Sequence, residues 1–248
     1  MMKWKKGYLL SKVIELKNID KYYKLKGDRL HALKSINLDI EQGDFLMIMG
    51  KSGSGKTTLL NLLGFLDSFD SGNYIFNGKD VTNLNENQKS EFRNEYMGFI
   101  FQQFHLIESL TIGQNVELPL LYKGNIPHKE RDKSIEKYLD MVGLLNKKNQ
   151  IPTELSGGQQ QRIAIARALI NNPYVIFADE PTGALDSNTS TEIMNILKKL
   201  NEENKTIIMV THDEDLVKYA NKVINIKDGV ITKGIGYVDN KLNQNSAL

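Results

Sequence analysis

The sequence has no cysteine and no long hydrophobic run. The absence of cysteine excludes disulfide frameworks, zinc sites built from thiolates and cysteine nucleophiles. No window approaches the roughly 18 consecutive apolar residues that a membrane-spanning helix needs. The basic start, residues 1–6, is followed by only a few apolar residues, which is too short for a signal peptide. Any segment that crosses a membrane is therefore expected to belong to another chain.

An excess of charge of one sign is also missing. The chain has 32 lysines and arginines against 30 aspartates and glutamates, a formal net charge of +2. That balance is too mild for a dedicated nucleic-acid binder. Apolar residues make up 40% of the 248 residues and charged residues 25%, as in ordinary globular domains. The composition thus excludes a disordered or collagen-like chain.

Short apolar runs alternate with helical patterns along most of the chain. Residues 45–49, 175–178 and 206–210 are almost wholly apolar, as buried parallel strands are. Between the last two runs, residues 193–200 carry isoleucine and leucine at helical spacing. This order predicts an α/β fold with a mostly parallel sheet and crossover helices.

Two segments differ from this pattern. Residues 12–40, together with 74–76, form short runs separated by turns, and we expect a small antiparallel β subdomain on the edge of the parallel sheet. Residues from about 104 to 153 are rich in asparagine, lysine and glutamate. They predict a helical insert broken at its three prolines, which are Pro119, Pro127 and Pro152.

The end of the chain carries a hairpin signal. Asp228-Gly229 lies between two short apolar runs, and this dipeptide favours the two-residue turn that needs positive φ. From Lys233 the sequence becomes polar. We therefore predict one domain over residues 12–232 and a polar C-terminal tail over 233–248.

A glycine-rich segment after the first buried strand has the spacing of a phosphate cradle. Gly50 to Thr57 matches G-x-x-x-x-G-K-[ST], with a predicted strand before it and a helix after it. The glycines allow backbone N–H groups to turn towards a phosphate, and the helix N-terminus adds its positive dipole end. Lys56 would neutralise phosphate oxygens and Thr57 would ligate Mg²⁺. The alternative, a flexible serine–glycine loop, does not explain the Lys-Thr pair.

Two further features select among the proteins that share such a cradle. Residues 175–178 end in Asp179 and Glu180, at the carboxyl edge of the sheet where α/β proteins bind ligands. Asp179 is expected to hold Mg²⁺, and Glu180 to polarise the water that attacks phosphorus. Alternatively, both carboxylates are solvated charges that end a strand. Ser156 precedes a helix, where it could be a simple N-cap.

Taken together, these segments resemble the nucleotide-binding subunit of an ATP-binding cassette (ABC) transporter, with a P-loop NTPase core. The resemblance covers roughly residues 12–232 and is closest to the branch of macrolide exporters, lipoprotein-release systems and antimicrobial-peptide exporters. Two positions depart from the usual pattern: Lys51 stands where proline is frequent, and Gly183 where serine is common. The motifs that carry the resemblance are Gly50 to Thr57, Phe101 to Phe104, Glu117 to Leu120, Leu155 to Arg162, Pro181 to Asp186 and His212.

The resemblance implies an ATPase with ATP and Mg²⁺ as ligands. It implies that Tyr23 stacks on adenine, with Tyr22 as the fallback, and that Gln102, rather than Gln103, joins Mg²⁺ and the attacking water. His212 would contact the γ-phosphate and orient Glu180. The implied catalytic residues are Glu180, His212 and Gln102, and the implied metal ligands are Thr57, Gln102 and Asp179. The implied nucleotide-binding residues are Tyr23, Gly50, Lys51, Ser52, Gly53, Ser54, Gly55, Lys56, Thr57, Thr58, Ser156, Gly157, Gly158, Gln159 and Asp186.

The resemblance also implies partners. Residues 156–158 would close over the ATP of a second copy, so that a homodimer forms on ATP binding, with Asp186 coupling the two subunits. Residues 99–107 carry much apolar area and would line a groove for a separate transmembrane permease, unless they only pack the insert onto the core. The chain would then be peripheral, at the cytoplasmic face of the cell membrane, and would touch the membrane only through the permease.

Three functions remain open. The first is the ATPase subunit of an exporter of peptides, macrolide-like drugs or lipid-linked cargo. The second is the ATPase of a transmembrane signalling or cell-wall-hydrolase-activating complex that moves no solute. The third, a cassette protein acting on ribosomes or DNA, is disfavoured by the near-neutral charge and by the presence of a single cassette. Cargo cannot be derived from this sequence, because selectivity belongs to the permease.

Overall fold

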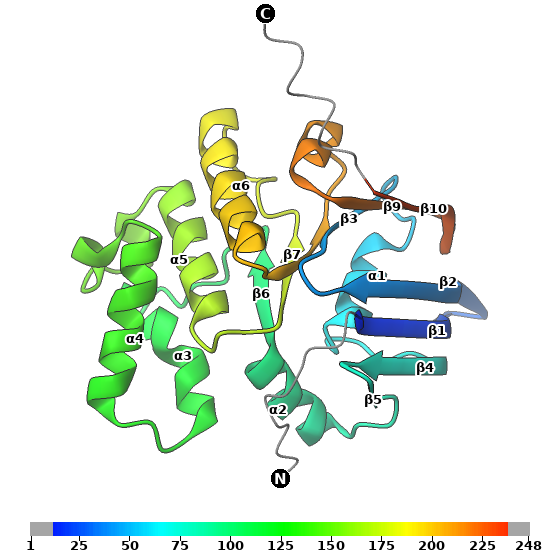
Figure 1. The fold of residues 1–248 in the computed structure, drawn as a ribbon, viewed down its shortest axis with the longest axis horizontal. Coiled ribbons are helices and arrows are strands. Elements are labelled where there is room, and N and C mark those ends of the chain that lie inside the picture. The colour runs from blue at the N-terminus through cyan, green and yellow to red at the C-terminus, as the bar shows by residue number, and fades with distance from the viewer. Residues whose placement is uncertain (1–11, 238–248) are drawn as a thin grey trace, which may run out of the picture.

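The computed structural model describes residues 12–237. A six-stranded sheet and a four-stranded sheet are covered by helices (Figure 1). Within these residues no helix is both long and apolar enough to cross a membrane. The strands are β1 (Lys12–Leu25), β2 (Asp28–Glu41), β3 (Phe45–Met49), β4 (Ser71–Phe76), β5 (Lys79–Asp80), β6 (Met97–Phe101), β7 (Val175–Asp179), β8 (Thr206–Val210), β9 (Lys222–Lys227) and β10 (Val230–Tyr237). The α-helices are α1 (Lys56–Leu63), α2 (Glu86–Tyr96), α3 (Ile112–Lys123), α4 (His128–Met141), α5 (Gly157–Leu169) and α6 (Ser187–Glu202), and the 3₁₀ turns are η1 (Leu145–Lys147), η2 (Pro152–Glu154) and η3 (Glu214–Tyr219).

The larger sheet has the strand order β10-β9-β3-β8-β7-β6. All its neighbouring pairs are parallel except β9 and β10. Every residue of β3 and of β8 is buried, which explains the continuous apolar runs in the sequence. The mostly parallel sheet predicted from those runs is confirmed, and it places the carboxyl ends of β3, β7 and β8 at one edge.

The central strands separate two hydrophobic cores. Side chains alternate along a strand, so Phe45 and Met47 of β3 face a core made with α3 to α6, whereas Leu46 and Ile48 face a core made with β1, β2, β4 and α1. In Figure 1, α5 and α6 accordingly lie to one side of the large sheet, and α1 with the smaller sheet to the other. The loops at the carboxyl edge are thus held by rigid elements on both sides.

The antiparallel β subdomain is present, as a sheet of its own beside the parallel one. Its strand order is β2-β1-β4-β5, and β10 and β6 are the edge strands of the larger sheet. The apolar face of β1 and β2 packs against α1 and β3. The predicted small antiparallel sheet is thus confirmed.

The insert is helical, with one correction. Pro127 precedes α4 and Pro152 begins η2, where proline is tolerated because no intrahelical N–H is lost. Pro119, however, lies inside α3 instead of ending it. Val116 and Leu120 on the same helix are buried in the core, and this packing outweighs the cost of the proline.

The C-terminal hairpin forms at the predicted turn. Asp228 has φ +51° and Gly229 has φ +79°, the positive values that such a turn requires. β10 runs to Tyr237, past Lys233, where the polar tail was predicted to begin. The backbone pairs with β9 up to Tyr237, and pairing of main-chain groups does not depend on side-chain hydrophobicity. The rest of that tail, residues 238–248, lies outside the described residues.

Candidate active site

The glycine-rich segment forms the turn between β3 and α1. Gly50 has φ +153° and Gly55 has φ +108°, values that favour glycine. A Cβ on Gly50 would lie 2.3 Å from the carbonyl oxygen of Ile226 on β9. The first glycine is thus needed because the loop passes directly under the neighbouring strand.

Lys56 is the first residue of α1, and its side chain folds over the loop. Its Nζ donates to the carbonyl oxygens of Gly50, at 2.8 Å, and Lys51, at 3.0 Å. The ammonium is therefore held against the cradle, at the positive end of the helix. Ser54 is buried, and its hydroxyl has no hydrogen-bond partner among the residues described. A buried cation and an unpartnered hydroxyl in one loop fit an anionic ligand such as a phosphate.

A cleft of about 820 Å³ opens over this loop. Its walls come from four parts of the chain: the cradle and α1, the β1–β2 hairpin, the loops after β7 and β8, and the turn between β9 and β10. The predicted residues that line it are Tyr23, Ser52, Gly53, Gly55, Lys56, Thr57, Thr58, Glu180 and His212.

The structure distinguishes the two adjacent tyrosines. Tyr23 lines the cleft, and its hydroxyl donates to Oδ2 of Asp67 at 2.6 Å. Burial and the Asp67 carboxylate raise the pKa of Tyr23. The Tyr22 ring instead stacks on His31, with centroids 4.1 Å apart. Sequence reasoning missed Asp67, because no spacing pattern links it to Tyr23.

The two carboxylates after the β7 run differ in environment. Burial raises the pKa of Asp179; the nearby Glu180 carboxylate raises it further and Lys56 opposes the shift. Glu180 follows the strand with φ +43°, a backbone conformation that few non-glycine residues adopt. Its Oε1 lies 2.9 Å from Nδ1 of His212, whose side chain is 68% exposed. The structure thus pairs the two residues that were predicted to act together.

Gln102 lies next to these groups although it does not line the cleft. A Cβ on Gly183 would lie 2.8 Å from Nε2 of Gln102 and 3.4 Å from Oε2 of Glu180. Both side chains therefore end against the same glycine. Gly183 has no positive φ, so the glycine is explained by this close approach and not by its backbone conformation. Gln103 is exposed.

Ser156 to Gln159 form the N-terminus of α5. The Ser156 side chain accepts a hydrogen bond from the backbone N–H of Gln159, and the Gln159 side chain accepts one from the backbone N–H of Ser156. This reciprocal pair is a capping box. A Cβ on Gly158 would lie 2.2 Å from Cγ2 of Thr189 on α6. None of the four residues lines the cleft around Lys56. The N-cap reading of Ser156 is correct locally, and the segment remains free to bind an anion outside its own cleft.

Asp186 also has a local role, because it is the N-cap of α6. Its Oδ1 accepts from the N–H groups of Asn188 and Thr189, and its Oδ2 accepts from the Thr189 hydroxyl. The hydrogen bonds from Thr189 lower the pKa of Asp186. Asp186 does not line the cleft. Its exposure leaves it accessible to a second chain.

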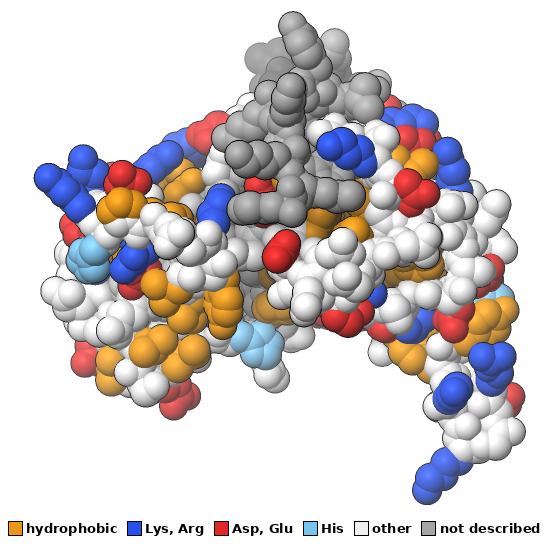
Figure 2. Space-filling model, turned by 90° about the horizontal axis from the view of Figure 1, so that it is seen from below, with side chains coloured by type: hydrophobic (Ala, Val, Ile, Leu, Met, Phe, Trp, Pro, Cys, Tyr) orange, Lys and Arg blue, Asp and Glu red, His pale blue; other side chains and the backbone are white. Residues whose placement is uncertain are grey.

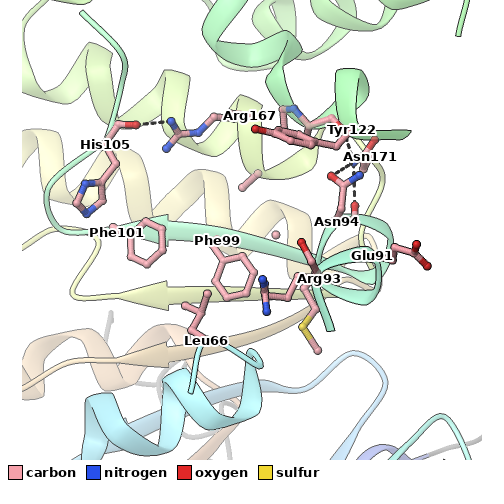
Figure 3. A pocket seen from close by; sticks show the side chains of 15 residues that line it. Leu66, Glu91, Arg93, Asn94, Phe99, Phe101, His105, Tyr122, Arg167 and Asn171 are labelled. Carbon is pink, nitrogen blue, oxygen red and sulfur yellow. Dashed lines mark hydrogen bonds between the residues drawn. The ribbon is translucent and has the colours of Figure 1, made fainter. Parts of the chain in front are cut away.

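A second hollow, of about 550 Å³, lies between the insert and the large sheet (Figure 3). Phe99 and Phe101 of β6 form its floor, and Tyr122, 83% exposed, stands at its wall. Figure 2 shows hydrophobic side chains gathered on the half of the molecule formed by the insert. Ile100, in contrast, is fully buried in the core. The apolar run at residues 99–107 thus serves both packing and an open groove.

Comparisons with known proteins agree with this geometry. The family model described as ABC transporter matches residues 33–183. The chain is 52% identical over 226 residues to the ABC transporter ATP-binding protein MJ1508 of Methanocaldococcus jannaschii, covering 89% of this chain and 98% of that protein. It is 48% identical over 219 residues to the macrolide export ATP-binding/permease protein MacB of Aggregatibacter actinomycetemcomitans, covering 88% of this chain. The chain spans only about a third (34%) of the MacB relative's length.

A solved structure is similarly close. The dimeric post-hydrolysis state of the ATP-binding cassette MJ0796, bound to ADP and Pi, superposes with a TM-score of 0.83 at 45% identity. The match covers 90% of this chain and 98% of that one. Fold, cradle and relatives point to one conclusion: the chain belongs to the ABC transporter family and is one of its ATPases.

Proposed function

We propose that this chain is the ATP-binding and hydrolysing subunit of a membrane exporter, which dimerises on ATP and drives a separate permease. The observation that carries the proposal is the single cleft that brings Tyr23, the cradle with Lys56, Glu180 and His212 together. Such a cleft has a surface for a base, a cation for phosphates and a carboxylate for the attacking water. The named relatives add the association of similar chains with macrolide export.

Mg²⁺ fits the donors at this site. Thr57, Asp179 and Gln102 offer hydroxyl, carboxylate and amide oxygens, the ligands that Mg²⁺ prefers. The raised pKa of Asp179 shows that burial and the Glu180 charge disfavour its carboxylate in the present state. A bound cation would relieve that cost. When bound, Mg²⁺ neutralises charge on the β- and γ-phosphates.

Hydrolysis follows from the pair formed by Glu180, after β7, and His212, after β8. Glu180 accepts a proton from, or polarises, the water that attacks phosphorus, and His212 holds Glu180 through the 2.9 Å contact. Gln102, which ends against the same glycine as Glu180, senses the γ-phosphate and completes the site. The strained φ of Glu180 fixes its carboxylate at the edge of the sheet.

Closure requires a second copy of the chain. The α5 N-terminus, with Ser156, Gly157 and Gly158, does not line the cleft of its own chain, and its N–H groups suit a phosphate. Each ATP is then held between the cradle of one subunit and the α5 N-terminus of the other. Because the γ-phosphate contacts exist only in the closed pair, hydrolysis shifts the equilibrium towards the open pair.

The permease binds at the second hollow, so that conformational changes of the ATPase are transmitted to it there. Its apolar floor, Phe99 and Phe101, and the charged side chains around it, Arg93, Arg167 and Glu91, suit a short amphipathic segment of the permease. The chain is thereby held peripherally at the cytoplasmic face of the membrane. Transport by vesicles that contain this chain and its permease supports the exporter. ATP-dependent activation of a cell-wall hydrolase without any flux supports the non-transporting alternative.

The substitution Glu180→Gln tests the hydrolytic assignment. The amide keeps the shape of the carboxylate but cannot take a proton, so we expect ATP to bind, dimers to accumulate and turnover to fall about 100-fold or more. Phosphate release and analytical ultracentrifugation measure the two effects. Glu202→Gln, an exposed position at the end of α6, is the matched control and should retain wild-type turnover. Wild-type turnover in Glu180→Gln refutes the assignment.

A further inference from the structure

Gln161 is a fully buried polar residue on α5 that no role described above uses; it is 0% exposed. Its Nε2 donates to the carbonyl oxygen of Phe101 at 3.3 Å and to that of Pro181 at 2.5 Å. Both partners only accept hydrogen bonds, so the amide nitrogen must face them. Phe101 directly precedes Gln102, and Pro181 directly follows Glu180. One side chain therefore ties α5 to the backbone beside both proposed catalytic residues.

A second side chain of α5 holds the other end of the Gln102 loop. The guanidinium of Arg167 donates to the carbonyl oxygens of Phe104, at 2.8 Å, and His105, and Figure 3 shows it reaching His105. The loop at Gln102 and Gln103 is thus fixed to α5 on both sides. A movement of α5 has to move this loop with it.

The other end of the Gln161 amide shows that the residue is not optimised for stability. Its Oε1 is buried and has no hydrogen-bond partner among residues 12–237. A buried acceptor without a partner costs free energy. An apolar side chain would avoid that cost but would release Phe101 and Pro181. The amide is therefore explained by what its nitrogen holds in place.

We propose that Gln161 is a positioning residue that couples the location of α5 to the geometry of Gln102 and Glu180. The N-terminus of α5 carries Ser156 to Gly158 and lies about one turn before Gln161. When that N-terminus seats on the ATP of a second copy, the helix moves as a rigid element and carries the carbonyls of Phe101 and Pro181 with it. Hydrolysis in one cleft is thereby linked to occupancy of the other. This inference rests on the proposed function, from which it takes the composite site and the roles of Gln102 and Glu180.

The substitution Gln161→Met tests the coupling, because methionine has a similar length but no donor. We expect kcat to fall about ten-fold, the change that the loss of roughly 1.4 kcal/mol of transition-state stabilisation produces. The KM for ATP, and the affinity of the isolated chain for a fluorescent ADP analogue, should stay within about two-fold of wild type. A merely structural role would lower kcat and nucleotide affinity together.

Asn201→Leu is the matched control for the loss of a buried amide. Nδ2 of Asn201 donates to the carbonyl oxygens of Gly43, at 2.8 Å, and Lys205, at 3.0 Å. These carbonyls lie at the opposite edge of the sheet, before β3 and β8. The control removes a buried amide at the edge of the sheet away from Gln102 and Glu180, so it should leave kcat unchanged.

Measuring Glu180→Gln in the same assay distinguishes a failure of the proposed function from a failure of the coupling through Gln161. Wild-type turnover in Glu180→Gln overturns the proposed function, and the coupling with it. If Glu180→Gln is inactive while Gln161→Met keeps the kcat of the Asn201→Leu control, only the coupling is overturned. The coupling is also overturned if Gln161→Met lowers kcat and nucleotide affinity by similar factors. A fall in kcat at unchanged affinity supports it.

Discussion

At the scale of single residues, two adjacent and identical side chains have different environments. Tyr22 and Tyr23 follow each other on β1, so their side chains point to opposite faces of the strand. Tyr23 lines the cleft and is held by Asp67, whose carboxylate also accepts from Lys21 at 2.7 Å. Burial opposes ionisation of Asp67, but the hydrogen bonds from Lys21 and Tyr23 outweigh it and lower its pKa. The Tyr23 ring is thus held in place at the wall of the cleft.

The two tyrosines provide a paired test of base stacking. Tyr23→Ala should weaken ATP binding by about 1–3 kcal/mol, the usual contribution of one base on an aromatic ring. Tyr22→Ala should change it little, because the Tyr22 ring does not itself line the cleft. Titration calorimetry with ATP and with tripolyphosphate measures the difference. Tripolyphosphate has no base, so equal losses for both ligands would contradict stacking.

Some residues of the site could not be found from sequence. Asp67 is 44 residues from Tyr23, and Gln161 is 60 residues from Phe101. No local pattern marks such contacts, because they form only when distant elements pack. The cradle and the Asp179-Glu180 pair, in contrast, were predictable. Each is a short segment whose neighbouring strand shows in the hydrophobic pattern.

At the scale of elements, one buried asparagine fastens the segment after β6 to α3. Asn115 is 0% exposed. Its Oδ1 accepts from the N–H of Ile107, and its Nδ2 donates to the carbonyls of Ile107, Leu110 and Thr111. The irregular segment between β6 and α3 thus has its backbone groups satisfied without regular structure. Asn115 gives this stretch of the insert its shape.

Asn115→Leu should lower the free energy of unfolding by about 2–4 kcal/mol, since it leaves several buried backbone groups unpaired. Chemical denaturation followed by circular dichroism measures the change. Asn149→Leu, the same substitution at an exposed position of the insert, is the control and should stay within about 0.5 kcal/mol. Similar losses for the two variants would show that the side-chain contacts of Asn115 contribute little.

Elements with a strong pattern were predictable, and elements held by tertiary contacts were not. β3, β7, β8 and α6 follow the apolar runs and the helical spacing of the sequence. Pro119 was expected to break a helix, yet α3 continues through it, packed in the core and joined by the Asn171 side chain at the Pro119 carbonyl. The last part of β10 was expected to be tail. It pairs with β9 through main-chain hydrogen bonds, which the residue types at these positions do not reveal.

At the scale of the whole molecule, one buried lysine joins the two sheets. Lys222 of β9 is 2% exposed, and its Nζ donates to Oδ2 of Asp44 at 2.8 Å and to the carbonyl of Asp39 on β2 at 2.9 Å. Lys222 thus ties the first residue of β9, which pairs with Leu46 near the start of β3, to β2. The cradle and the cleft lie beyond the other end of β3.

Asp44→Ala should destabilise the protein by about 3–5 kcal/mol, because it removes the carboxylate that the buried ammonium of Lys222 contacts at 2.8 Å. The double substitution Asp44→Ala with Lys222→Met removes the buried charge as well and should recover part of that loss. Denaturant midpoints at constant slope measure both. A double variant that is less stable than Asp44→Ala alone would show that the charge of Lys222 does not cause the loss.

Two copies of the chain are expected to pair through the N-terminus of α5. Ser156→Arg places a bulky cation at the α5 N-terminus, where a second copy's nucleotide would sit. It should leave nucleotide binding by the isolated chain within about two-fold and, in the Glu180→Gln background, abolish dimers formed on ATP. Ser156→Ala removes only the N-cap hydrogen bond, at a cost of about 1 kcal/mol of stability, and should still dimerise. Dimerisation of Ser156→Arg at wild-type ATP concentrations would contradict the composite site.

Mixing two defective chains tests the same geometry more sharply. Ser156→Arg has an intact cradle, and Lys56→Ala, which should weaken nucleotide binding, has an intact α5 N-terminus. Head-to-tail pairing of the two variants leaves one cleft with both intact halves and one with both halves damaged. In a dimer of either variant alone, every cleft combines one intact half with one damaged half. We therefore expect the mixture to hydrolyse ATP faster than either variant at the same total concentration, measured by phosphate release. Turnover that merely averages the two would mean that each chain completes its own site.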